Sequence, residues 1–452
     1  MNFSDRFARA FHKILPSPFA IALLLTFITF SLAGILTDDP LADNSRPYLV
    51  QLADYWYAGV WDSALMVFAM QMMLILVLGH VLALSKPVDK LINLLVKTCS
   101  NTAKTALIVC FFSLIVSFFN WGLGLVFGAI FARKIAEKAL INGYKINYGL
   151  IGAAGYSGLM VWHGGLSGSA PIKVAEPGHF LEAKLGLISQ SQTIFSTMNI
   201  SVSLALLIFL PLLMYLLGKY AKDSKPEIEL KPQTELLKHT ISGAEKIDNS
   251  QLVSLVTGGL ILTYILYLIF IPPETVSLSV ITPNFINMSL LGLAIVFHQN
   301  FKSFLLAVDS AISGASGILI QFPLYFGIMG IMKYSGLTIL MSDFFISIST
   351  TESFPVLTLL SAGIVNIFVP SGGGQWAVQG PIIAEAALKL NVLPAKAIMA
   401  LAYGDQLTNM VQPFWALPLL GITGLKGKEI LPYTLILMVV GAIIFITGLL
   451  LF

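Results

Sequence analysis

Long apolar runs separated by short polar segments dominate the chain from residue 18 onward. Such runs cover residues 18–36, 63–84 and 193–218 in the first half, and 252–271, 282–297, 304–332 and 430–452 in the second. An α-helix needs about 20 mainly apolar residues to cross the hydrocarbon core of a membrane. The pattern therefore predicts an all-α polytopic membrane protein in contact with the lipid bilayer.

Three polar segments divide these runs. The segment after residue 36 carries Asp38, Asp39, Asp43 and Asp54 and predicts a loop. Residues 86–104 alternate Lys with Leu and Ile, as a helix lying on the membrane surface does. Residues 219–250 hold six Lys and six acidic residues and predict a cytoplasmic linker. The linker would join an N-terminal membrane repeat, residues 1–218, to a C-terminal one, residues 251–452.

Two further apolar runs contain residues that a helix does not tolerate. The run 353–384 contains Pro-Ser-Gly-Gly-Gly at 370–374, and the run 105–132 contains Asn-Trp-Gly-Leu-Gly at 120–124. Proline lacks a backbone donor, and glycine is the poorest ordinary helix former. Broken backbone at membrane depth is tolerated only where it is buried in protein or lines a watery cavity. Both breaks therefore predict a substrate or ion site, and the alternative is a kink in an ordinary helix.

The two halves share one order of features. Each break is followed by a helical run and then by a second broken span, at residues 163–171 and 405–413. The separation between Gln71 and Gln321 equals that between Asn120 and Pro370. Interrupted segments in corresponding positions of two halves are typical of secondary transporters and mark their binding sites.

The positions of Lys and Arg predict the topology, because cytoplasmic loops collect these residues. If both broken runs are re-entrant hairpins and the N-terminus is cytoplasmic, most basic residues lie inside, and nine crossings leave the C-terminus in the periplasm. The two repeats are then inverted. The basic residues expected outside are Arg46, Lys173, Lys184, Lys333, Lys389 and Lys396.

Composition agrees with a membrane protein and excludes other classes. Hydrophobic residues make up 56% of the chain and charged residues 11%, against about 25% charged in soluble proteins. A net charge of +3 does not indicate a nucleic-acid partner. Cys99 and Cys110 form no disulfide framework and no metal motif. The sequence also lacks a nucleophile elbow, a zinc-protease motif and paired intramembrane aspartates, so we expect no enzyme and no bound cofactor.

Asp405 is a formal charge that we expect within a core span. A carboxylate at membrane depth is costly and is usually paired or functional. It fits a Na⁺ ligand, with the neutral oxygens of Thr408, Asn409 and Gln412 nearby, or a group that takes up a proton. Na⁺ is favoured slightly because it needs several oxygen ligands. The alternative is a structural acid that caps a broken helix.

An anionic substrate would have to bind without Lys or Arg, because we expect neither in the membrane core. Backbone N–H groups at helix N-termini can hold an anion. We expect such half-helices to begin near Gly124 and Gln375. Helix packing and interhelical hydrogen bonds are the alternatives for the residues near these breaks. His163 could bind a carboxylate or relay a proton, and a structural role is the alternative. The candidate substrate-binding residues are Gln71, Asn120, Trp121, Gly122, Gly124, Ser167, Ser169, Gln321, Ser371, Gly372, Gly373, Gly374 and Gln375.

Four motifs resemble those of the bacterial short-chain fatty acid transporter family: Asn-Trp-Gly-Leu-Gly-Leu-Val at 120–126, Gly-Gly-Leu-Ser-Gly-Ser at 164–169, Val-Pro-Ser-Gly-Gly-Gly-Gln-Trp at 369–376 and Gln-Pro-Phe-Trp-Ala-Leu-Pro at 412–418. The resemblance runs from about residue 11 to residue 452. It implies uptake of short-chain fatty acids such as acetoacetate or butyrate across the bacterial inner membrane. It also implies inverted repeats with two re-entrant hairpins. In the wider ion-transporter group hairpin tips bind substrate and Na⁺, which points to Asn120, Ser371 and the adjoining glycines.

We therefore interpret the chain as a secondary active transporter of small monocarboxylates that works by alternating access, with Na⁺ or H⁺ as the symported ion. Because oligomers are common in the wider group, the resemblance raises a homodimer as an expectation. The alternatives are a carrier of other organic anions such as dicarboxylates, an intramembrane enzyme and a passive channel.

Overall fold

The computed structural model describes residues 17–37, 46–228, 243–271, 280–369 and 371–452. These residues form helices and turns, with one isolated β-bridge between Ile146 and Ser224 and no strand among them. The all-α prediction is therefore confirmed. The elements of the first half are α2 (Pro18–Leu36), α3 (Tyr48–Val60), α4 (Ser63–Ala83), α5 (Lys86–Thr98), α6 (Thr102–Phe119), α7 (Trp121–Asn142), α8 (Tyr148–Tyr156), the 3₁₀ turns η1 (Ser157–Met160) and η2 (Trp162–Gly164), α9 (Ser169–Lys173), α10 (Glu182–Leu185) and α11 (Thr197–Tyr220).

The second half continues the helical pattern. Its elements are α12 (Glu245–Asp248), α13 (Gln251–Phe270), α14 (Pro283–His298), α15 (Phe301–Ala311), the 3₁₀ turn η4 (Ile312–Ala315), α16 (Ser316–Tyr334), α17 (Leu337–Ser347), α18 (Phe354–Phe368), α19 (Gly372–Lys389), α20 (Pro394–Thr408), the 3₁₀ turn η5 (Asn409–Val411), α21 (Pro413–Thr423) and α22 (Gly427–Leu451). Asp38, Asp39, Asp43, Pro370, the predicted cytoplasmic N-terminus and linker residues 229–242 lie outside the described residues.

Within the described part of the chain, seven helical segments are long and apolar enough to cross a membrane. They are Phe19–Leu36, Ser63–Ala83, Thr102–Phe119, Thr197–Tyr220, Gln251–Phe270, Phe301–Tyr334 and Gly427–Leu451. This pattern supports a multi-pass membrane protein. The number of crossings, their orientation and the division into two repeats stay predictions.

Helix α3 corrects the prediction of a loop after residue 36. The acidic residues in this segment suggested a polar loop, but Asp54 lies on an exposed face of α3, with its carboxylate 3.3 Å from Arg46. The opposite face packs closely on α16, because Gly59 and Gly330 have no side chains. A Cβ at either position would clash with the backbone of the other helix. The one acidic residue of α3 lies on its exposed face and is therefore compatible with a helix.

Both predicted breaks in the long runs are present. Asn120 ends α6 and begins α7, and residues 369–371 separate α18 from α19. The half-helices begin at Trp121 and Gly372, three residues before the expected Gly124 and Gln375. The second breaks are also present, as η1 and η2 between α8 and α9 and as η5 between α20 and α21. Whether the broken pairs are re-entrant hairpins in inverted repeats stays a prediction.

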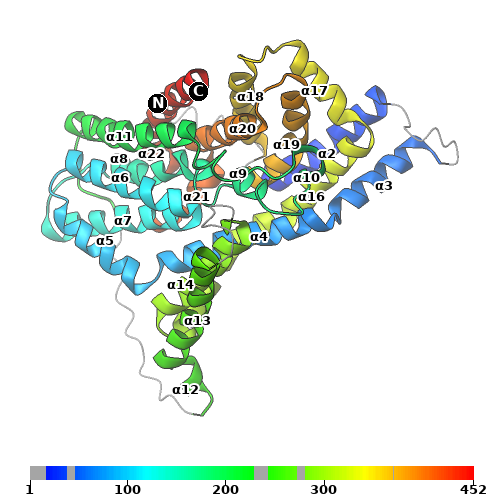
Figure 1. Cartoon of the computed structure of the whole chain (residues 1–452). Coiled ribbons are helices and arrows are strands. Elements are labelled where there is room, and N and C mark those ends of the chain that lie inside the picture. The colour runs from blue at the N-terminus through cyan, green and yellow to red at the C-terminus, as the bar shows by residue number, and fades with distance from the viewer. Residues whose placement is uncertain (1–16, 38–45, 229–242, 272–279, 370) are drawn as a thin grey trace.

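The helices form two packed groups (Figure 1). One group contains α2, α3, α4, α13, α14, α15 and α16. The other contains α6, α7, α8, α11, α18, α20, α21 and α22. Helix α4 contacts α7, and α16 contacts α19, so the N-terminal ends of α7 and α19 lie where the two groups meet. Gly128 of α7 and Gly155 of α8 bring these helix backbones into direct contact, because a Cβ at either position would clash with the other backbone.

Candidate substrate site

A cavity of about 750 Å³ lies between the two helix groups. Helix α4 contributes one wall, with Met72, Leu76 and His80 spaced one turn apart. The other walls come from α7, from the segment η4–α16 and from α21. Seven of the predicted substrate-binding residues line this cavity, from four different parts of the chain: Trp121, Gly122, Ser169, Gln321, Ser371, Gly372 and Gly373.

The N-terminus of α7 opens into the cavity with one unpartnered donor. The side chain of Asn120 accepts from the N–H of Leu123 at 2.8 Å, and Ser167 Oγ accepts from the N–H of Trp121 at 2.9 Å. The N–H of Gly122, which lines the cavity, has no hydrogen-bond partner among the described residues. Asn120 and Ser167 are fully buried and hold the helix end in place instead of facing the cavity.

The N-terminus of α19 faces the same cavity. Ser371 Oγ accepts from the N–H of Gly374 at 3.2 Å. In the described part of the chain, the N–H groups of Gly372 and Gly373 have no partner, and both residues line the cavity. Two helix N-termini with unpartnered N–H groups therefore lie at the wall of one space, and the positive ends of two helix dipoles there suit an anion.

The cavity walls carry little charge. Among the described residues that line it there is no Lys, Arg, Asp or Glu, and His80 is the one titratable side chain. Gln321 also lines the cavity, and its side chain has no hydrogen bond to any described residue. The other polar side chains of the wall are serines and the three Trp indoles, and most of the wall is apolar. The space therefore accommodates a small anion with an apolar body.

Three indole rings form the apolar wall beside the helix ends. The ring centroid of Trp121 lies 5.7 Å from that of Trp162 and 5.2 Å from that of Trp415. The rings of Trp162 and Trp415 lie 6.0 Å apart. All three line the cavity, and aromatic faces pack well on a short alkyl chain.

A layer of aromatic rings adjoins the cavity at Phe322 and Gly373, which line it. The ring of Phe68 lies 6.3 Å from both Phe180 and Phe322, and Phe180 lies 6.0 Å from Trp376. A Cβ on Gly373 would lie 2.9 Å from the ring of Phe322 and 3.1 Å from that of Phe68. The tip of α19 is thus packed directly beneath this layer. The cavity extends the other way along α4, toward His80 and Leu84.

A buried charged network lies beyond the aromatic layer. Lys173 Nζ is 2.5 Å from Glu176 and donates to Gln71 Oε1 at 3.1 Å, and it lies 5.5 Å from the centre of the Phe68 ring. Gln71 Nε2 donates to Glu176 at 2.7 Å and to Asn284 at 2.9 Å. Lys173 is 2% exposed, so this cation lies within the packed protein. That it lies on the outer side of the membrane, and that the membrane core holds no Lys or Arg, stay predictions. Gln71 is part of this network and does not line the cavity.

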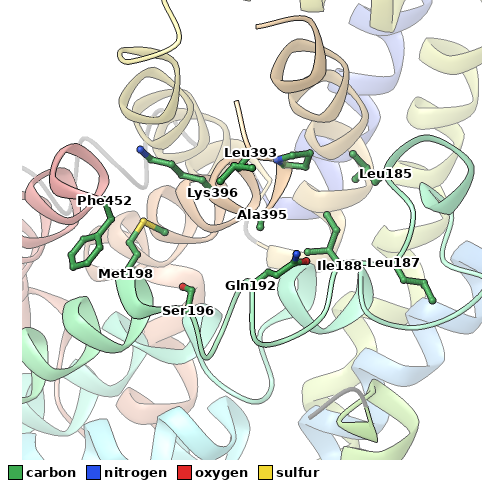
Figure 2. A pocket seen from close by; sticks show the side chains of 11 residues that line it. Leu185, Leu187, Ile188, Gln192, Ser196, Met198, Leu393, Ala395, Lys396 and Phe452 are labelled. Atoms are coloured by element: carbon green, nitrogen blue, oxygen red, sulfur yellow. The ribbon is translucent and has the colours of Figure 1, made fainter. Parts of the chain in front are cut away.

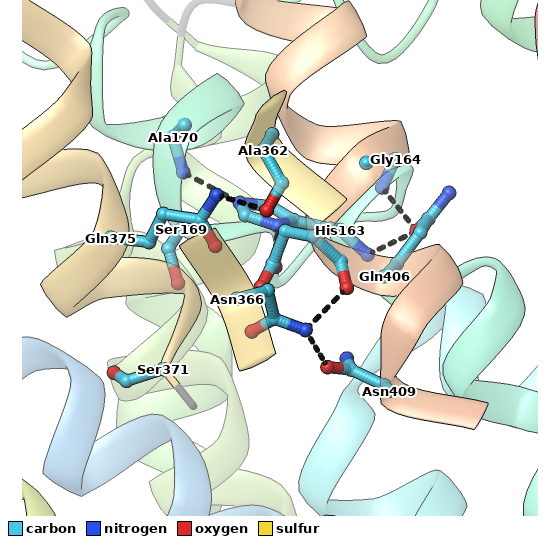
Figure 3. A network of polar contacts seen from close by, with 12 residues as sticks. His163, Gly164, Ser169, Ala170, Ala362, Asn366, Ser371, Gln375, Gln406 and Asn409 are labelled. Carbon is cyan, nitrogen blue, oxygen red and sulfur yellow. Dashed lines mark hydrogen bonds and ion pairs between the residues drawn. The ribbon is translucent and has the colours of Figure 1, made fainter. Parts of the chain in front are cut away.

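Asp405 forms a buried pair with His163. Both side chains have no exposed surface, and the Nδ1 atom of His163 bonds to Asp405 Oδ2. Backbone N–H groups of His163 and Gly164 donate to Gln406 Oε1 at 2.9 and 3.4 Å, which holds η2 against α20 (Figure 3). The sequence left His163 in doubt, because nothing along the chain shows that residues 163 and 405 meet. The one available signal was that both lie in the second breaks of their halves.

The other predicted ion-coupling residues point elsewhere. The amide of Asn366 on α18 donates to Asn409 Oδ1 at 2.7 Å (Figure 3). It also donates to Thr408 Oγ1 at 2.9 Å. Gln412 Nε2 donates to the carbonyl of Asn366 at 2.6 Å. Thr408, Asn409 and Gln412 therefore join α18 to the break after α20. The structure does not gather them around the Asp405 carboxylate.

The remaining predicted residues support the helix ends from behind. Gln375 Nε2 donates to the carbonyl of Ala362 at 2.9 Å and to Gln379 at 2.9 Å. Gly124 lies against Ser117, and Gly374 lies against the ring of Tyr325. These contacts fix the tips of α7 and α19, and none of the three residues lines the cavity.

A second cavity of about 500 Å³ lies apart from this site (Figure 2). Its walls come from the segment 185–198, the beginning of α20 and Phe452. Apolar residues such as Leu187 and Leu393 dominate it, with Lys396 as its charged residue. None of the predicted site residues lines it.

Comparisons with known proteins identify the family. The family model described as "Short chain fatty acid transporter" matches residues 1–452. The chain belongs to the short-chain fatty acid transporter family. A member from Escherichia coli K12, named as a short-chain fatty acid transporter, is 35% identical over 443 residues, which is 97% of this chain and 96% of that protein. A member of the same name from Haemophilus influenzae is 37% identical over 458 residues, 98% of each chain. The predicted family is therefore confirmed.

Two solved structures share the fold of this family member. The YdaH transporter of Alcanivorax borkumensis aligns with a TM-score of 0.56 at 14% identity, over 96% of this chain and 98% of that one. MtrF of Neisseria gonorrhoeae, described within a class of antimetabolite efflux pumps, aligns with a TM-score of 0.60 at 14% identity, over 97% of each chain. At this identity the likeness concerns the fold alone.

Proposed function

We propose that the chain takes up short-chain fatty acids such as acetoacetate and butyrate across the bacterial inner membrane, by secondary active transport with alternating access. The observation that carries this proposal is the cavity where the N-terminal ends of α7 and α19 meet. The unpartnered N–H groups of Gly122, Gly372 and Gly373 would bind the substrate carboxylate, and the indole wall would hold its alkyl part.

The charge of the cavity supports a monocarboxylate over a dicarboxylate. A second carboxylate would need a second set of donors or a cation, and the described lining offers no Lys or Arg for it. Ser169, Ser371 and Gln321 are neutral and would contribute hydrogen bonds. Transport of a substrate with one charge at one end and an apolar body at the other fits this arrangement.

A gradient of H⁺ or Na⁺ would drive uptake through Asp405, which lies directly behind Gly372. With the predicted topology, the end of the cavity near His80 and Leu84 faces the cytoplasm, and the aromatic layer closes it from the periplasm. A homodimer is the oligomer we propose. None of these features requires enzymatic chemistry.

Counterflow of labelled butyrate in proteoliposomes tests this proposal, because a carrier exchanges substrate without net movement. Gly373→Val would place a branched side chain at the tip of α19, where even its Cβ would clash with the rings of Phe322 and Phe68. This variant should abolish exchange. Gly259→Val is the matched control, because a Cβ at Gly259 meets nothing within 4 Å. Full exchange by a well-inserted Gly373→Val protein would refute the site. Flux of butyrate without counterflow would indicate a channel.

A further inference from the structure

The Asp405–His163 pair has one proton position that its hydrogen bonds fix. The backbone N–H of Ala170 points at His163 Nε2, 3.2 Å away. A backbone N–H can only donate, so Nε2 must present a lone pair. The proton of the neutral ring therefore lies on Nδ1 and is donated to Asp405 Oδ2. The ring of Trp162 stacks on the imidazole, with centroids 4.5 Å apart, and holds its orientation.

This arrangement makes Asp405 Oδ1 the place where a further proton binds. A second ring proton would sit on Nε2 and oppose the N–H of Ala170. Oδ1 is buried and has no hydrogen-bond partner among the described residues. Protonation there breaks neither existing bond and removes an uncompensated charge from a fully buried site, where ionised groups are costly.

The carboxylate of Asp405 also lies at the helix end that would bind substrate. A Cβ built on Gly372 would be 2.9 Å from Asp405 Oδ2, 2.9 Å from the His163 ring and 2.6 Å from Trp162. The carboxylate therefore lies against the backbone of Gly372, and Gly372 lines the cavity. An ionised Asp405 and a substrate carboxylate would therefore compete for the positive end of α19.

The elements packed around Asp405 offer no other group that titrates near neutral pH. Tyr156 donates to the carbonyl of Asn409, and Tyr403 donates to Asn199; phenols ordinarily ionise near pH 10. Lys173 on α9 faces Gln71 and Glu176. The charged residues of α19 lie in its last turns and those of α22 in its first turn: Glu385, Lys389, Lys428 and Glu429.

Resting on the proposed function, we propose that Asp405, positioned by His163, takes up the symported proton at Oδ1, and that a short-chain carboxylate binds the N-terminus of α19 much more tightly in that state. Uptake forms one O–H bond at Oδ1 with a proton from water, and release on the other side breaks it. One proton then accompanies one substrate anion, so transport moves no net charge.

The size of the effect follows from the repulsion of two carboxylates. At a separation of about 6 Å and an effective dielectric constant of ~20, the repulsion weakens anion binding on the order of a hundredfold. Above the pH at which the pair loses its proton, the affinity for butyrate should fall by about tenfold per pH unit, as for one linked proton.

Isothermal titration calorimetry of the purified protein with butyrate, in alkaline buffers that differ in ionisation enthalpy, counts the protons taken up on binding. Direct binding also avoids the leak of neutral acid through bilayers. The wild type should take up about one proton per butyrate. Asp405→Asn should take up none, and its affinity should no longer change with pH.

His163→Leu tests whether His163 positions Asp405 for proton uptake or only stabilises the fold. Loss of the Nδ1 donor makes ionised Asp405 less stable, so the loss of binding should move to higher pH. A uniform loss of affinity with an unmoved pH profile would overturn the role of His163. Wild-type binding without proton uptake, or binding that needs Na⁺, would overturn the inference and leave the proposed function standing. No binding of any short-chain carboxylate would overturn both.

Discussion

Removal of the buried Lys173 charge should destabilise the protein strongly. The side chain of Lys173 is 3% exposed and that of Glu176 11% exposed. In Lys173→Met the apolar stem is kept, but Glu176 stays buried without its cation and keeps only the amide of Gln71, at 2.7 Å. Breaking a buried ion pair in this way typically costs about 3–5 kcal/mol. Glu176→Gln should cost a similar amount, because it leaves the ammonium group unpaired.

The double variant Lys173→Met/Glu176→Gln removes both charges and should lose much less stability than the sum of the single variants. Unfolding in mixed detergent micelles, followed by tryptophan fluorescence, would give the three free energies and their coupling. Arg46→Met is the matched control, because the Arg46–Asp54 pair is more than half exposed and such pairs contribute little. Single variants that are as stable as the control, or strictly additive effects, would refute the buried-pair reasoning.

Two further predictions concern topology and substrate size. In a background without native cysteines, Lys138→Cys and Lys389→Cys test the proposed topology. The cysteine at 138 should resist membrane-impermeant reagents added outside intact cells, and the one at 389 should react. Ready labelling at 138 would refute the inverted arrangement. Trp121→Ala removes an indole from the cavity wall, so competition assays with acids of increasing length should show a shift toward longer chains. An unchanged order of preference would mean that this wall does not contact the substrate.

The sequence was sufficient for features that depend on local composition. Helix α2 runs from Pro18 to Leu36, as the apolar run predicted, because charged or polar residues bound the run at both ends. The breaks at Asn120 and before Gly372 lie where glycine, proline and polar residues cluster within an apolar run, whereas single prolines such as Pro211 and Pro323 stay inside helices.

Features that depend on contacts between distant residues could not be predicted. The burial of Lys173 depends on Gln71, which lies far away along the chain and supplies part of its hydrogen-bonding environment. Asn409 and Gln412 have the oxygen atoms that a Na⁺ site needs, but Asn366 of α18 engages both residues. Side-chain chemistry indicated which residues were able to bind an ion, and only the packing of α18 on α20 decided where they point.

The pair that we propose as the proton carrier contains one residue from each half of the chain. His163 belongs to the first half and Asp405 to the second, and Gln406 adds hydrogen bonds across the same boundary. Neither half made as a separate polypeptide would contain the pair. The connection through residues 219–250 then keeps the halves at a high effective concentration. Co-expression of two fragments divided in that segment would accordingly restore a complete coupling centre wherever the halves reassociate in the membrane.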